Sequence, residues 1–457
     1  MLKRTVMATA LAAACTTLSS SPAFAASDED LAQMRNEIRQ MKQEYEARIQ
    51  ALEQRLQAAE AQPAPAPVAT AASVPAAPSS TATANAFNPA ISAILGGTYA
   101  NLSKDPSKYR IQGFVPGGED IGPGQRSFNL GESEITLSAN VDPRFAGQVT
   151  FSLGSDNSAS VEEAFFQTKD LSNGLNVKGG RMLSSVGYLN SIHAHAWDFV
   201  DAPLAYQAFF GGQYKTDGLQ LKWLAPTERF LELGAELGNG GAFPGNNRNK
   251  NGAGAAAVFA HMGDDIGESA SWRAGVSWLH TGSSNRTYND TDSAGAAVTN
   301  AISGHANTLI VDGVYKWAPN GNSTQTNFKL QGEYFRHRED GTLAFDTTGR
   351  ALANTYASAQ SGWYLQGAYQ FMPAWRVGLR YDRLSSGTPD IGLVGGGVLT
   401  AADFPQLASW HPSRTSLMFD YSASEFSRLR LQFAQDKSRP DAIDNQVFLQ
   451  YIMSLGV

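Results

Sequence analysis

The 457-residue sequence contains one cysteine, Cys15, which falls in an N-terminal stretch with the features of a secretion signal. A charged start, an apolar run and an A-x-A pattern at 23–25 predict a signal peptide over residues 1–25. Its removal leaves no thiol, which excludes disulfides and cysteine metal sites from the mature chain. A lipobox at 12–15, ending at Cys15, is the alternative for this stretch.

Long apolar runs, catalytic motifs and an excess of basic residues are also missing. No run of 18 apolar residues follows the N-terminal stretch, which excludes a protein that spans a membrane with helices. The sequence lacks the G-x-S-x-G, H-E-x-x-H and P-loop patterns, so we expect no enzymatic activity. The formal net charge of −7 gives no indication of nucleic-acid binding, for which a basic surface is expected.

Two segments precede the main part of the chain. Apolar residues in 27–61 recur at spacings of three and four between charged flanks, which predicts a short coiled coil that joins copies of the protein. The alternative is a lone amphipathic helix, although an isolated helix is marginal in water. Residues 62–86 are rich in Ala and Pro and predict an extended, semi-rigid linker.

Residues 87–457 repeatedly show apolar side chains at every second position, in segments of about ten residues. Glycine, with 44 residues, and aromatic residues, at 10%, suit strands and tight turns. Short connections alternate with mostly longer ones. The sixteen predicted strands are 88–102, 129–141, 145–154, 160–169, 174–182, 214–224, 230–238, 253–262, 270–280, 306–318, 327–338, 361–371, 375–384, 414–423, 427–437 and 444–457.

Strands of this length, with short connections at one end and long ones at the other, predict an all-β transmembrane barrel of about 16 antiparallel strands. Closure pairs every strand edge, as the core of a bilayer requires. The apolar rows would then face lipid and the polar rows a water-filled interior. A soluble all-β protein is the alternative, but such a protein would bury its apolar rows and has no need for two different ends.

The order of helix, Ala/Pro linker and sixteen-strand barrel resembles the trimeric porins with periplasmic coiled coils, of the DcaP-like and phosphate-selective type. The segments 88–103, 127–142, 180–214 and 218–240 are similar to Gram-negative outer-membrane proteins labelled porin-like, TonB-dependent-receptor-like or zinc-regulated. The resemblance implies an outer-membrane trimer that passes small hydrophilic solutes. The chain departs from the TonB-dependent type, because no plug-sized domain precedes the barrel, and from the usual aromatic C-terminus, because it ends in Val457.

The segment 183–213 interrupts the strand pattern, and its turn-forming and aromatic residues predict a structured loop. It is the third long loop in the count. In the porins that the chain resembles, this loop folds inward and narrows the pore. The residues predicted to form the constriction are Tyr188, His193, His195, Trp197, Asp198 and Asp201.

Two kinds of site fit this loop. The nitrogen and oxygen ligands of His193, His195, Asp198 and Asp201 suit zinc or a similar divalent ion, the one cofactor that the sequence suggests. Alternatively, the four residues form a hydrogen-bonded lining, whose histidines change charge between about pH 5 and 8 and tune ion selectivity.

The inner wall is the second predicted site. If the apolar rows face lipid, the alternation turns basic residues inward, which would concentrate anions. Alternatively, these charges pair with acidic neighbours and leave little selectivity. The predicted pore-lining basic residues are Lys222, Arg273, Arg376, Arg380, Arg428 and Arg430, and the acidic residues predicted to face inward include Glu134, Glu232, Glu236, Asp312, Glu333 and Asp382. Arg336 and Arg338 point outward near the rim and are candidates for contacts with lipopolysaccharide phosphates.

These observations predict a passive outer-membrane porin, a trimer held together by coil and barrel, with small hydrophilic solutes crossing a loop-constricted pore. A zinc-associated uptake or binding barrel that uses the His/Asp loop is the alternative. A structural barrel whose coil touches the periplasmic wall is a third hypothesis.

Overall fold

The computed structural model describes residues 89–117, 121–169 and 171–455. The predicted signal peptide, coiled coil and linker lie outside the described residues. Within the described ranges, no helix is long and apolar enough to cross a membrane.

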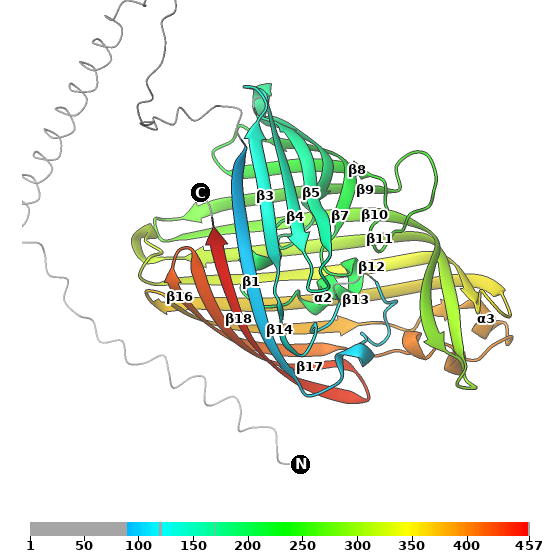
Figure 1. The fold of residues 1–457 in the computed structure, drawn as a ribbon. Helices are drawn as coiled ribbons and strands as arrows, with labels where there is room; N and C mark the ends of the chain where they lie inside the picture. The colour runs from blue at the N-terminus through cyan, green and yellow to red at the C-terminus, as the bar shows by residue number, and fades with distance from the viewer. Residues whose placement is uncertain (1–88, 118–120, 170, 456–457) are drawn as a thin grey trace, which may run out of the picture. The chain divides into compact units, whose positions relative to one another are not determined.

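The described chain folds into one closed antiparallel barrel (Figure 1). Its sheet has 18 strands, of which β2 (Ser127–Leu130) and β15 (Asp390–Ile391) are short additions, and the other sixteen form the wall. The wall closes where β1 (Ala90–Leu102) pairs with β18 (Ala442–Leu455) on one side and with β3 (Ser133–Asn140) on the other. The sixteen-strand prediction is therefore confirmed.

Most of the other wall strands agree closely with the predicted positions, because the alternation of apolar and polar residues marks each crossing. These other strands are β4 (Phe145–Leu153), β5 (Ala159–Thr168), β6 (Leu175–Leu183), β7 (Lys215–Leu224), β8 (Phe230–Gly238), β9 (Ala255–Ile266), β10 (Ala270–Thr291), β11 (Ala297–Trp317), β12 (Asn327–Phe345), β13 (Leu352–Met372), β14 (Trp375–Ser385), β16 (Ser413–Ser424) and β17 (Ser427–Arg439). The helical elements of the connections are η1 (Pro106–Lys108), η2 (Ser172–Gly174), η3 (Ala194–Ala196), α2 (Leu204–Phe210), η4 (Pro319–Gly321), α3 (Gly392–Gly395), η5 (Ala401–Asp403) and η6 (Pro405–Leu407).

Strands β10 to β13 are much longer than predicted, at 19 to 22 residues. The segments 281–305 and 339–360, predicted as long loops, are mostly strand, and the connections shrink to 292–296 and 346–351. One side of these strand extensions is polar, and this weakens the apolar alternation by which a strand is recognised in the sequence. The other side carries apolar residues that pack against the connection 386–412, and this contact stabilises the extensions; the cluster includes Tyr288, Val298, Ile302, Leu343, Phe345, Leu393, Phe404 and Leu407.

The outer face of the wall is apolar. In β14, Trp375, Leu379 and Tyr381 are exposed, whereas the alternating Arg380 and Asp382 are buried. Aromatic pairs lie toward both ends of this strand, where Trp375 meets Tyr421 and Tyr381 meets Trp363. Aliphatic residues between aromatic ends are typical of a strand that crosses a bilayer.

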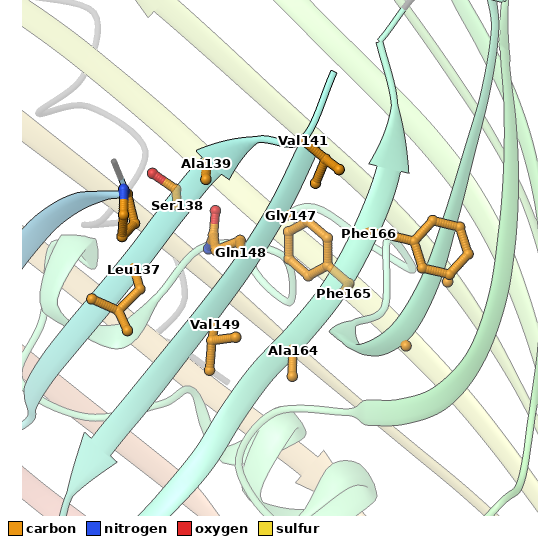
Figure 2. A pocket seen from close by; sticks show the side chains of 13 residues that line it. Leu137, Ser138, Ala139, Val141, Gly147, Gln148, Val149, Ala164, Phe165 and Phe166 are labelled. Atoms are coloured by element: carbon orange, nitrogen blue, oxygen red, sulfur yellow. The ribbon is translucent and has the colours of Figure 1, made fainter. Parts of the chain in front are cut away.

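A shallow hollow interrupts the outer face over β3 to β6. Figure 2 shows side chains from neighbouring strands around it, with Leu137, Val149 and Ala164 in adjacent positions and Phe166 at one edge. The register places Val149 opposite both Leu137 and Ala164, which makes the hollow a feature of small side chains in the wall.

The inner face is less polar than predicted. Alongside polar and charged residues it carries an apolar patch, because strands such as β12 alternate apolar residues on both sides, with Tyr334 exposed and Phe335 buried. The patch packs against the connections that fold into the barrel. Its wall residues are Ala255, Ala257, Leu279, Ile310, Phe335, Tyr364 and Leu384.

Candidate functional site

The segment 184–214 connects β6 to β7 and packs inside the barrel against the apolar patch. Its helix α2 has every residue buried. The helix ends at Gly211, whose left-handed backbone (φ 65°) lets its N–H bond back to the carbonyl of Gln207, at 3.2 Å. With only seven residues, α2 depends on these surroundings, because short helices are unstable in isolation.

Glu333, on the inner face of β12, holds the beginning of the segment and its helix together. Its carboxylate accepts hydrogen bonds from the backbone N–H groups of Tyr188 (3.1 Å) and Leu189 (3.0 Å). It also accepts from the hydroxyl groups of Tyr206 (2.9 Å) and Tyr364 (2.6 Å). One buried carboxylate therefore joins two wall strands to both parts of the segment.

Asp198 and Asp201 bind basic residues of β12 and of the strands that follow it in the wall. Asp198 pairs with Lys329 at 2.9 Å and with Arg376 at 3.1 Å. Asp201 pairs with Arg380 at 2.8 Å and with Arg414 at 2.6 Å. Trp197, between them and the histidines, is buried, and its carbonyl accepts a hydrogen bond from Arg430 at 2.8 Å.

The basic environment keeps both aspartates ionised. Burial acts to raise the pKa of Asp201, but the guanidinium groups of Arg414 and Arg380 outweigh it and lower the pKa to about 2. Burial also acts on Asp198, where Lys329 and Arg376 prevail and lower the pKa below its ordinary value. Charged anchors of this kind stay in place over the whole neutral range.

All six basic residues predicted to line the pore lie on the inner side of the wall, each with an acidic neighbour. Lys222 pairs with Glu232, Arg273 with Asp312, Arg376, Arg428 and Arg430 with Asp420, and Arg380 with Asp382. Arg380 and Arg430 are almost fully buried, whereas Arg273, Arg376 and Arg428 keep 22–24% of their side chains exposed. Arg336 and Arg338 occupy the opposite, outward parity of β12.

The two histidines face a third part of the wall, formed by β3 and β5. His193 Nδ1 lies 3.1 Å from Glu134 Oε2 and 3.4 Å from Glu162 Oε2, and His193 Nε2 lies 3.1 Å from Glu163 Oε2. His195 Nδ1 lies 3.2 Å from Glu134 Oε1. Burial acts to lower the pKa of His193, but Glu134, Glu162 and Glu163 together raise it to about 12.

The four residues predicted as one metal set thus separate into two groups. His193 and His195 lie together against acidic residues, while Asp198 and Asp201 contact basic ones. The alternation of the strands correctly predicted that Glu134 and Glu333 face inward. It did not predict that Glu162 and Glu163 both face inward, because adjacent residues of a strand normally point to opposite faces. Tyr188 lies between two cations, with Arg273 5.2 Å and Lys329 5.5 Å from its ring centre.

No known family model matches the sequence. The chain is 28% identical over 379 residues to an uncharacterized protein of Aquifex aeolicus, covering 77% of this chain and 74% of that protein. It is similar in structure to a loop L8 deletion mutant of OmpT, an outer membrane protein of Vibrio cholerae, with a TM-score of 0.50, 12% identity and coverage of 81% and 100%. The outer membrane channel DcaP of Acinetobacter baumannii gives a TM-score of 0.46 at 12% identity, with coverage of 80% and 96%. The described chain therefore shares its closed antiparallel barrel fold with this outer membrane protein of Vibrio cholerae.

Proposed function

We propose that the protein is a passive porin of the outer membrane for small hydrophilic solutes. The observation that carries the proposal is the closed sixteen-strand wall, apolar outside and rich in charges inside, with the segment 184–214 bound to its inner face. An apolar outer band suits a bilayer, and charges on the inner face suit water-borne solutes.

In this proposal the segment 184–214 constricts the pore, and its residues divide between two tasks. Trp197, Asp198 and Asp201 are buried or ion-paired and anchor the segment. Tyr188, His193 and His195 keep part of their surfaces exposed, so these three side chains meet the solutes.

Conductance across a planar bilayer tests the proposal. We expect stable current steps from the purified protein, and larger steps from a variant in which a short Gly/Ser linker replaces residues 188–210. Both proteins are checked by circular dichroism for an intact barrel. Absence of current from both folded proteins contradicts a pore; equal steps from both contradict the constriction alone.

A preference for anions is the finer part of the proposal. Because each predicted basic residue has an acidic neighbour, we expect the preference to be weak and to depend on the partly exposed Arg273, Arg376 and Arg428. Reversal potentials in a salt gradient should shift toward cations in Arg273→Gln but not in Arg338→Gln, whose side chain points outward. An unchanged potential in Arg273→Gln contradicts this assignment.

The assembly and the outer-membrane surroundings are also proposals. The heptad pattern of 27–61 supports a trimer with its coil in the periplasm, and the outward Arg336 and Arg338 support contacts with lipopolysaccharide phosphates. Removal of 27–61 should dissociate the trimer in detergent, as measured by light scattering. A trimer of unchanged size contradicts the role of the coil.

A further inference from the structure

A β-bulge in β5 builds an acidic pocket opposite the two histidines. In the pairing of β4 with β5, Thr150 lies opposite Glu163 and the adjacent Phe151 lies opposite Val161, so Glu162 is the extra residue. A bulge places two residues against one and redirects a side chain. Glu162 and Glu163 are consequently both buried, with 5% and 6% of their surfaces exposed, and both approach His193.

Two buried atoms at the centre of this pocket have no hydrogen-bond partner in the described chain. They are Glu162 Oε2 and His193 Nδ1, which lie 3.4 Å from each other. An unpartnered buried carboxylate oxygen is costly, because it loses its hydration without compensation. The two atoms lie beside the carboxylate of Glu134, whose Oε2 is 3.1 Å from His193 Nδ1.

The charge in this space also favours a further cation, because the single imidazolium of His193 faces the carboxylates of Glu134, Glu162 and Glu163. Ligand oxygens of Glu132, Glu134 and Glu162 lie within 4.8 Å of one another. Lys215 approaches only the other oxygen of Glu162, at 3.9 Å. Three carboxylates so close repel one another unless a proton or a metal ion lies between them.

We propose that His193, His195, Glu134 and Glu162 bind one divalent cation with the ligand preference of zinc. Nitrogen and carboxylate ligands at about 2.1 Å from a tetrahedral zinc lie about 3.4 Å apart. The distances from His193 Nδ1 to Glu134 and Glu162, and from His195 Nδ1 to Glu134, are 3.1, 3.4 and 3.2 Å.

Glu163 is the positioning residue of this site. It faces the second nitrogen of His193 at 3.1 Å, and its other oxygen accepts the backbone N–H of Leu183 at 3.0 Å. A carboxylate behind a histidine ligand holds the ring and directs its free nitrogen toward the metal. The bound ion would link the segment 184–214 to β3 and β5. This inference goes beyond the proposed porin function, because binding does not require conduction.

Zinc titration of the full-length protein in detergent, after treatment with a chelator, tests the site by calorimetry. We expect one Zn²⁺ per chain and an increase in the unfolding temperature, because a ligand of the folded state stabilises it. Glu162→Gln should weaken binding by about a hundredfold or more and abolish the increase. Glu163→Gln should weaken binding by about ten- to a hundredfold, as expected of a supporting carboxylate.

Glu162→Gln is suited to this test because Glu162 Oε2 supports no hydrogen bond that the fold needs. His411→Gln, at an exposed histidine outside the pocket, is the matched control and should bind as the unaltered protein does. Circular dichroism verifies the fold of each variant. Absence of zinc binding by the unaltered protein, or equal binding by the folded Glu162→Gln protein, overturns the proposal.

Discussion

At the scale of single residues, Asp201 illustrates how the segment 184–214 is held. Its carboxylate lies between Arg380 and Arg414, both almost fully buried, and it also accepts a hydrogen bond from Gln432 at 2.9 Å. This carboxylate therefore interacts with several buried partners at once. Its loss removes one negative charge from a buried network in which Asp382 also pairs with Arg380 at 3.0 Å and with Arg414 at 3.6 Å, and breaking a buried ion pair is strongly destabilising.

Asp201→Asn therefore tests the anchor. We expect it to lower the free energy of unfolding by about 3–5 kcal/mol, the usual cost of breaking a buried ion pair, and to increase the noise of the conducting state as the segment loosens. Denaturant titration and single-channel recording measure the two effects. Asp340→Asn, at an exposed position of β12, is the control, and an equal loss in both variants contradicts the anchoring role.

The same carboxylate predicts a pH dependence. The folded pKa of Asp201, about 2, lies below the ordinary value of 3.8, so the folded state binds its proton less readily than the unfolded state. This stabilisation is present above about pH 4 and is lost as the pH falls through about 2. Unfolding midpoints measured from pH 7 to pH 2 should fall more steeply in the unaltered protein than in Asp201→Asn. Parallel curves contradict the assignment.

At the scale of elements, α2 is a helix formed by its surroundings. Phe209 contacts Phe335, His337 and Phe114, with ring centres 5.3–5.9 Å apart. Packing against the apolar patch of the wall thus supplies the stability that a helix of seven residues lacks by itself. The bulge in β5 is a second element of this kind, because it depends on the pairing with β4.

Phe209→Ala should detach α2 from the wall. Loss of a buried phenylalanine typically costs about 3–5 kcal/mol. We expect limited proteolysis to cut within 184–214, while the wall, held by its own hydrogen bonds, stays closed. Mass spectrometry of the fragments locates the cuts. Phe230→Ala, at an exposed position at the beginning of β8, should leave the segment resistant, and resistance in Phe209→Ala contradicts the packing argument.

At the scale of the whole molecule, the outer face decides where the protein can reside. Leu379, near the middle of β14, is 57% exposed. A basic side chain in the middle of a lipid-facing strand costs about 2–4 kcal/mol in a bilayer. Val398, in the connection 386–412, is equally apolar and 53% exposed, but it lies outside the wall.

Leu379→Arg should thus lower the free energy of unfolding in lipid vesicles by about 2–4 kcal/mol, whereas Val398→Arg should have little effect. Reversible urea titrations in vesicles measure both values. Equal effects at the two positions contradict a lipid-facing wall. The same pair of variants in detergent shows whether the difference depends on the bilayer.

The sequence by itself determined the wall. Apolar and polar residues alternate with period two, so the sequence indicates where each strand lies and which of its residues face outward and inward. The agreement between predicted and observed bounds at β14 and β18 shows this. It also indicated that 184–214 is structured, because a disordered loop has few aromatic residues. The extensions of β10 to β13 were not predicted, because the polar residues on one side of them weaken the apolar alternation.

Only the tertiary structure decided which residues meet. His193 and Asp198 are five positions apart, yet one faces glutamates of β3 and β5 and the other faces Lys329 and Arg376. No local rule separates them, since the curvature of the wall brings distant strands to each part of the segment. Glu162 faces inward only because a bulge shifts the register, and a bulge is a property of two paired strands rather than of one sequence.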